Sequence, residues 1–463
     1  MATVLRCVRH FALVLLLLVA GRRPAPAYSL LTHQQLIDLT WQDAIVPLLL
    51  SKYPTLTPAQ LDTAKSYAYG GCAIQDIGYY PFGDEFFSDL THYVRTGDFV
   101  LALFRNAHDA NELAFAVGAL THYVGDSIGH SQATNRAVAL QFPKLAAAYG
   151  QSVNYAQGRH QHVQTEFAFD IYQIVQHRMA PLGYLRHIGL NVPVHQLALA
   201  FYQTYGITED FTGHGRTFNI ETYRFAARTL IPRTAYALTL LHRNHEAAEP
   251  ATPDAQTIEK EAAAVALENN WAAYRRRKVS FETHLLAALI AILPKAGPLA
   301  MTAIKGPTSA AEADYMHSLV STTSMIRDRL YLFTPVADRR PPPAGVTVTP
   351  FPPQSKDQRH PLVNRDLDTG LPVKPGGYPL TDITYAALLK RLTANPRQPI
   401  PPGIQQDVLA YYSDANAPIV TKKDSRAWEK VQAELKTLAA MSTSDEPAPY
   451  PTYGLGLDTS ASP

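Results

Sequence analysis

The chain has 463 residues, of which 46% are apolar and 17% are charged, a composition typical of a globular protein with a sizeable core. Its net charge of +2 gives no electrostatic reason to expect a long polyanion as partner. Composition and charge therefore exclude a disordered chain and argue against a strongly basic nucleic-acid binder.

Residues 1–27 have the pattern of a signal peptide. Arg6, Arg9 and His10 form a basic start, and the apolar run from Phe11 to Ala20 is too short to span a bilayer comfortably. Ala25-Pro26-Ala27 is a small-x-small cleavage site. Cleavage after Ala27 removes four arginines and no acidic residue, so the net charge becomes about −2. We expect a secreted or periplasmic protein, with an uncleaved anchor as the alternative.

Most of residues 33–335 has the spacing of amphipathic helices. Apolar residues recur at helical spacing from Leu36 to Leu49, and Thr57-Pro58 supplies the N-cap and first residue of another helix. Alternating runs typical of strands are rare, and Val346–Thr349 is the main one. The expected fold class is all-α, a multi-helix bundle with long loops. Further helices are expected at 86–94, 97–107, 109–131, 136–149, 161–180, 194–205, 216–246, 254–293 and 309–333.

The composition changes after residue 335, which divides the predicted domains. Pro341-Pro-Pro343 and Lys374-Pro-Gly-Gly-Tyr-Pro379 mark residues 336–380 as a Pro-rich linker or wrapping segment. A small helical C-terminal region is expected at 381–443, with helices at 381–392, 402–412 and 422–441, and a disordered tail at 444–463. The main helical domain is assigned to residues 28–335.

Two helices carry side chains that suit a metal ion. His122, Asp126 and His130 lie at i, i+4 and i+8, within roughly 80° of one another around a helix. His162 and Glu166 repeat the i, i+4 spacing about one helix later. Apolar residues surround both sets, and buried histidines and carboxylates are costly unless they are paired or bound to metal. The pattern indicates a metalloenzyme.

Other candidate ligands extend this set along the chain. They are Tyr28 through its amine if cleavage follows Ala27, His33, Asp76 and His92. In this order the residues resemble those of the zinc-dependent phospholipase C family, whose wider superfamily includes the S1/P1 nucleases. The resemblance covers roughly residues 28–180. It implies a helical bundle of the phospholipase C/P1 nuclease type.

The resemblance also implies how three zinc ions are held. Tyr28, His33 and Asp126 belong to the first site, and a second takes Asp76, His92, His122 and Asp126. The third site takes His130, His162 and Glu166, which leaves one position for water. Asp126 bridges two ions. Asp76 is the expected catalytic residue, orienting or deprotonating the water that becomes the attacking hydroxide.

Two departures from the family pattern stand out. Family members usually begin with Trp, whereas Tyr28 stands here; the chelating atoms are backbone atoms, so this changes packing more than ligation. His130 lies four positions after Asp126, whereas the usual spacing is six. This spacing is similar to the glycosylphosphatidylinositol phospholipase D branch.

Other histidines and one cysteine have simpler interpretations. His160 could replace His162, but only His162 lies four residues before Glu166. His108, His242 and His245 are interpreted as surface residues. Cys7 leaves with the signal peptide, so Cys72 has no intramolecular disulfide partner, and a small buried residue is the preferred interpretation.

The substrate class rests on aromatic residues and on charge. Tyr79, Tyr80 and Phe82 follow Asp76 and could enclose a quaternary ammonium head group or stack a nucleobase; ordinary loop packing is the alternative. Because the sequence has no basic stripe, phospholipid or a membrane surface is the preferred substrate, and nucleic acid is less expected. No stable protein partner is implied. An S1/P1-type nuclease or nucleotidase is the second hypothesis, and a non-catalytic zinc-stabilised binding module is the third.

Overall fold

The computed structural model describes residues 29–80, 83–211, 220–241, 252–276, 281–292, 304–333 and 362–444. Within these ranges the regular structure is helical, accompanied by two isolated β-bridges, so the all-α fold class is confirmed. In the same ranges, no helix has both the length and the hydropathy needed to cross a bilayer. Several predictions from the sequence lie outside the described residues: the signal peptide, Tyr28, Phe82, His242, His245, the strand-like run 346–349, the linker up to residue 361 and the tail from residue 445.

The site is built on six helices and two short helical turns. Other helices pack around them. The site-forming elements are α2 (Leu30–Thr40), α4 (Pro58–Gly71), a 3₁₀ turn (Ile77–Tyr79), α5 (Glu85–Tyr93), α6 (Thr96–Arg105), α7 (Ala110–Gly129), a π-helical turn (His130–Thr134) and α10 (Arg159–Val175). The other helices are α3 (Val46–Lys52), α8 (Asn135–Gln141), α9 (Pro143–Tyr149), α11 (Leu182–Ile188), α12 (Val194–Tyr205), α13 (Ile220–Phe225), α14 (Ile231–Leu241), α15 (Pro253–Glu268), α16 (Trp271–Arg275), α17 (Phe281–Ile292), α18 (Ser309–Phe333), α19 (Pro379–Thr393), α20 (Pro402–Tyr411) and α21 (Ser425–Ala440).

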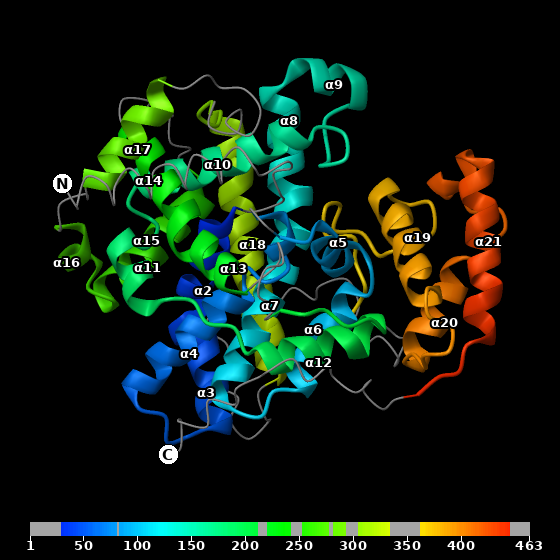
Figure 1. Ribbon diagram of the computed structural model, residues 1–463. Coiled ribbons are helices and arrows are strands. Elements are labelled where there is room, and N and C mark those ends of the chain that lie inside the picture. Colours follow the sequence, from blue (N-terminus) through cyan, green and yellow to red (C-terminus); the bar gives the residue numbers. More distant parts are fainter. Residues whose placement is uncertain are drawn as a thin grey trace, which may run out of the picture.

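Helix α7 is the central element of the bundle. Almost all of its residues are buried, as expected for a helix that is apolar on every side. Asp109 caps its start by accepting a hydrogen bond from the backbone N–H of Glu112. Helices α2, α4, α6 and α18 pack against it, and Figure 1 shows α7 and α18 passing through the middle of the molecule. The ligand residues of α7 therefore lie deep in the protein.

Two glycines allow α4 and α7 to pack unusually closely. A Cβ atom on Gly71 would lie 2.0 Å from the carbonyl oxygen of Phe115, and one on Gly118 would lie 2.2 Å from that of Ala68. Neither distance is compatible with a side chain, so the two backbones touch only because both positions are glycine. This contact brings the end of α4, including Cys72, against the part of α7 that carries His122.

Several helix boundaries differ from those predicted. The stretch expected as one helix over 254–293 divides at Asn270, whose φ of 50° is left-handed and ends the helical run. The helix expected over 136–149 divides before Pro143, which cannot donate the backbone hydrogen bond that would continue α8. The helix expected over 161–180 ends at Val175. The first two breaks come from Asn270 and Pro143, single residues whose effect helical periodicity does not detect.

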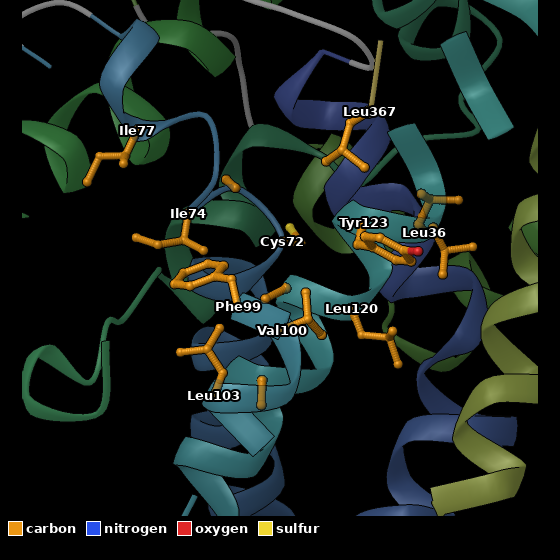
Figure 2. Packing of buried hydrophobic residues seen from close by; sticks show 14 of the residues in the cluster. Leu36, Cys72, Ile74, Ile77, Phe99, Val100, Leu103, Leu120, Tyr123 and Leu367 are labelled. Atoms are coloured by element: carbon orange, nitrogen blue, oxygen red, sulfur yellow. The ribbon is translucent and has the colours of Figure 1, made fainter. Parts of the chain in front are cut away.

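The C-terminal residues share the core of the bundle. Leu367 and Leu388 belong to the same cluster of buried apolar side chains as Leu36, and Figure 2 shows Leu367 together with Leu36 and Tyr123. Helices α19 to α21 form a group beside α5 and α12 (Figure 1). The predicted boundaries between the helical domain, the linker and the C-terminal region stay a prediction.

Candidate metal centre

Eight side chains that the sequence singled out come together in the centre of the bundle. His33 lies on α2, Asp76 precedes the 3₁₀ turn, His92 lies on α5, His122 and Asp126 lie on α7, His130 begins the π-helical turn, and His162 and Glu166 lie on α10. Each is at most 2% exposed. They form three groups whose candidate ligand atoms lie within 4.8 Å of one another: His33, His122 and Asp126; Asp76, His92 and His122; His130, His162 and Glu166.

The group around His92 has the spacing of ligands on one zinc ion. Two ligands bound tetrahedrally at about 2.0–2.2 Å from zinc lie roughly 3.3–3.6 Å apart. The Nε2 atom of His92 lies 3.3 Å from Asp76 Oδ1 and 3.4 Å from His122 Nε2. The distance from His122 Nε2 to Asp76 Oδ1 is 3.9 Å. One ion at the centre of these atoms would satisfy all three.

Asp126 lies between two of the groups. Its Oδ1 atom is 3.2 Å from His33 Nε2, while Oδ2 is 3.1 Å from His122 Nε2 and 3.4 Å from His92 Nε2. The two oxygens thus face different sets of histidines. This is the geometry that a bridging carboxylate requires.

Backbone carbonyls hold two of the histidines in a ligating orientation. The Nδ1 atom of His92 lies 2.8 Å from the carbonyl oxygen of Ser88, and Nδ1 of His122 lies 2.9 Å from that of Cys72. A ring that donates its Nδ1 proton to a carbonyl leaves the Nε2 lone pair free to bind a metal. Cys72 is buried, as predicted, and supports the site through its backbone oxygen.

Without a cation, the carboxylates of the centre favour the protonated forms of His92 and His122, whose pKa values are raised. Burial lowers the pKa of His92, but hydrogen bonds and charges from Asp126 and Asp76 outweigh burial and raise it to about 10. Burial also raises the pKa of Asp126, yet His122 and His33 bring it well below its ordinary value. A metal ion binding here would take the place of these protons, so binding releases them.

The third group is organised differently. His162 Nδ1 lies 2.7 Å from Glu166 Oε1, and its Nε2 lies 2.7 Å from the side-chain oxygen of Asn135. Both nitrogens of His130 are buried without a hydrogen-bond partner. The 2.7 Å distance is shorter than the spacing of two ligands on zinc, so an ion here would have to separate His162 and Glu166 by roughly half an ångström or more.

The structure distinguishes between neighbouring histidines. His160 is exposed at the start of α10, whereas His162 is buried against Glu166, which favours His162 as the ligand. His108 is exposed, as expected for a surface residue. His130 lies four positions after Asp126, about one helical turn further on, and is buried where the π-helical turn begins.

The predicted aromatic residues lie beside the centre. The Tyr79 ring packs 5.3 Å from that of His92, and its hydroxyl donates to Asp89. Tyr79 is buried, whereas Tyr80 is partly exposed and stacks on Tyr223 with ring centroids 6.2 Å apart. Sequence reasoning did not identify Tyr223, because it lies on α13, far along the chain.

Two polar residues at the third group were also missed. Asn135 follows the π-helical turn and contacts His162. Asp368 is buried with its Oδ1 atom 3.5 Å from His130 Nδ1. The only signal in the sequence is the pair Asp366 and Asp368 on either side of Leu367, which interrupts an otherwise Pro-rich segment.

One comparison with known proteins matches the part of the chain that carries the centre. No curated protein and no solved structure matches the chain. Residues 32–210, which include all eight side chains of the centre, match the family model described as zinc dependent phospholipase C. Over these residues the resemblance stated from the sequence is confirmed.

Proposed function

We propose that the protein is an exported zinc-dependent phosphodiesterase that hydrolyses phospholipids in the manner of a phospholipase C. The observation that carries this proposal is Asp126, whose two oxygens face His33 on one side and His92 and His122 on the other at 3.1–3.4 Å. A carboxylate in that position suits two adjacent metal ions, and adjacent metal ions are a recurring device for phosphodiester hydrolysis.

The donor set fits zinc. Imidazole nitrogens and carboxylate oxygens are ligands that zinc accepts in proteins. Asp76 Oδ1 and both oxygens of Asp126 are buried and face only histidine nitrogens at 3.1–3.9 Å. Several carboxylates and histidines so close together in a protein interior are costly, and a cation bound between them reduces that cost.

The residues around the ions supply positioning and proton transfer. Bound zinc ions provide a water of lowered pKa and positive charge for the phosphate oxygens. Asp76 is placed to orient the attacking water or to accept its proton, because its carboxylate reaches the group formed by His92 and His122. The carbonyls of Ser88 and Cys72 hold those two rings in place while the charge on the substrate changes.

The start of α2 supports the proposed role of Tyr28. Asp170 accepts hydrogen bonds from the Leu31 backbone N–H at 3.3 Å and from the Thr32 hydroxyl at 2.7 Å. These bonds fix the first turn of the helix that carries His33. Cleavage after Ala27 would place the new amine one residue before Ser29, the N-cap of that helix.

One extra glycine before Tyr28 is therefore expected to cost one zinc ion. The extension turns the amine into an amide, which binds metal poorly, and it removes the chelate formed by the amine and the carbonyl. Zinc content per chain, measured on proteins that begin at Tyr28 or at the added glycine, checks this. Tyr28→Trp is the matched control, because it keeps the amine and should keep the zinc. Equal zinc content in the extended and unextended proteins would rule out N-terminal chelation.

Zinc analysis followed by a substrate panel tests the proposed function. The purified mature protein is assayed on phosphatidylcholine vesicles, phosphatidylinositol vesicles and single-stranded DNA. Release of diacylglycerol and a phosphorylated head group supports the proposal, whereas phosphatidic acid would indicate D-type cleavage. Cleavage of DNA alone would indicate the nuclease hypothesis. Bound zinc with no hydrolysis of any substrate would favour a binding module, and absence of zinc would refute both enzyme hypotheses.

A further inference from the structure

A C-terminal segment reaches the third metal group from outside the region matched by the family model. Residues 362–373, here called the acidic strap, lie across α5, α6 and α7. Asn364 accepts hydrogen bonds from the backbone N–H groups of Gly97 and Asp98 at the start of α6. The Thr96 hydroxyl donates to the carbonyl oxygen of Arg365, and the Leu367 N–H donates to that of His92. The acidic strap is thus fixed to the elements that carry the ligands.

Close packing fixes the acidic strap further. Gly370 has a φ of 69°, and a Cβ atom there would lie 2.1 Å from the carbonyl oxygen of Ser127 on α7. Only glycine fits both the left-handed backbone and the contact. Leu367 belongs to the same core cluster as Tyr123 (Figure 2). Asp368 lies between Leu367 and Gly370, so the packing of these two residues fixes its position.

The two oxygens of Asp368 have different surroundings. Its Oδ2 atom accepts hydrogen bonds from the hydroxyls of Tyr93 and Tyr378. Its Oδ1 atom is buried, has no hydrogen-bond partner and lies 3.5 Å from His130 Nδ1. The backbone oxygen of Asp368 accepts from Asn135, whose side-chain oxygen contacts His162. Asp368 therefore connects to both histidines of the third group.

The contact between Asp368 and His130 has the length expected for two ligands of one ion. At 3.5 Å it is longer than the 2.7–3.2 Å of a normal hydrogen bond to nitrogen, but it falls in the range of about 3.3–3.6 Å that separates tetrahedral zinc ligands. Neither ring nitrogen of His130 has a hydrogen-bond partner. Two facing, buried and unpartnered polar groups at this distance leave room for a cation between them.

We propose that Asp368 is a fourth protein ligand of the third metal group, together with His130, His162 and Glu166. This inference rests on the proposed zinc-dependent function. Four protein ligands are characteristic of a structural zinc site, whereas three with an open position are characteristic of a catalytic one. The acidic strap thus closes the third site.

Zinc stoichiometry of the full mature chain tests this. Under a competing chelator at which the wild-type protein keeps three zinc ions, Asp368→Asn should keep two, with the third bound roughly 100-fold more weakly or worse. Asp366→Asn is the matched control, because it is the same substitution two residues away on the acidic strap. An Asn there can still accept the hydrogen bond from the Asp368 N–H, and this variant should keep three.

A double variant identifies which ion is lost. His130→Ala alone should lose one zinc, and Asp368→Asn added to it should lose no further zinc, because both residues serve one site. Tyr378→Phe provides a milder change, since it removes one hydroxyl from Asp368 Oδ2 and should weaken the third zinc by about 10–100-fold.

The outcomes separate this inference from the proposed function. Wild-type stoichiometry and affinity in Asp368→Asn would overturn the role of Asp368 while leaving the other two zinc sites in place. If Asp368→Asn does not fold, unchanged affinity for the third zinc in Tyr378→Phe would overturn it instead. A wild-type protein without zinc would overturn both the inference and the proposed function.

Discussion

Asp126→Ala is expected to remove two zinc ions and leave one. Its Oδ1 faces His33 at 3.2 Å, and its Oδ2 faces His122 at 3.1 Å and His92 at 3.4 Å, so both groups lose a ligand in one substitution. Loss of an outer partner of a metal ligand typically costs about 10–100-fold in affinity, and a bridging ligand should cost more at each site. The group of His130, His162 and Glu166 does not include Asp126 and should keep its ion.

Metal analysis and a diesterase assay on one preparation measure this effect. We expect the zinc content to fall from three to one and activity on the preferred substrate to fall at least about 1,000-fold, since the ions that hold water and phosphate are lost. Asp89→Asn is the matched control: this carboxyl lies near the centre on α5 and accepts a hydrogen bond from Tyr79, but it belongs to none of the three groups. Loss of a single zinc in Asp126→Ala would show that Asp126 does not bridge. Circular dichroism of the variant separates loss of metal from loss of fold.

The sequence alone could predict most of the centre because its ligands follow helical geometry. His122 and Asp126 are one turn apart on α7, and His162 and Glu166 are one turn apart on α10, so their spacing is local information. His33, Asp76 and His92 have no such spacing, and only the order of the whole set indicated them. The structure brings them to the same place because α2 and α4 pack against α7, and His92 on α5 lies 3.4 Å from His122 on α7.

Asp368 shows what could not be predicted. It lies more than 200 residues after Glu166, in a segment whose composition predicts only a linker or a wrapping segment. Its position depends on tertiary contacts, namely the hydrogen bonds of Asn364 to α6 and the contact of Gly370 with α7. None of these leaves a periodic pattern. For the same reason the stacking of Tyr80 on Tyr223 could not be foreseen.

The aromatic residues after Asp76 show a different limit of prediction from sequence. Tyr79 was predicted from its proximity in sequence to Asp76, and it does lie beside His92. Tyr79 is buried and donates a hydrogen bond to Asp89. Both features fit ordinary loop packing, which was the alternative to substrate binding in the sequence analysis. Tyr80 is the better candidate to contact a substrate because it is partly exposed. A residue's neighbours in sequence indicate where it lies but not which way its ring faces.

Asp76→Asn is expected to have the opposite signature to Asp126→Ala: most of the zinc is kept and most of the turnover is lost. The amide keeps an oxygen that can face His92 and His122, but it carries no charge and accepts no proton at neutral pH. General-base catalysis typically contributes about 100- to 10,000-fold, so the turnover number should fall by that factor while the Michaelis constant changes little.

Comparing Asp126→Ala with Asp76→Asn separates a role in metal binding from a role in catalysis. Zinc content and turnover are measured together at several pH values, because removal of a base also changes the pH dependence that remains. Full diesterase activity in Asp76→Asn would refute the catalytic role of Asp76 and leave it as a ligand only. Loss of zinc in parallel with activity would mean that its charge is needed to hold the ion. A zinc content near that of the wild type together with a much lower turnover number would assign Asp76 to the attacking water. In that case activity is lost although the metal is kept.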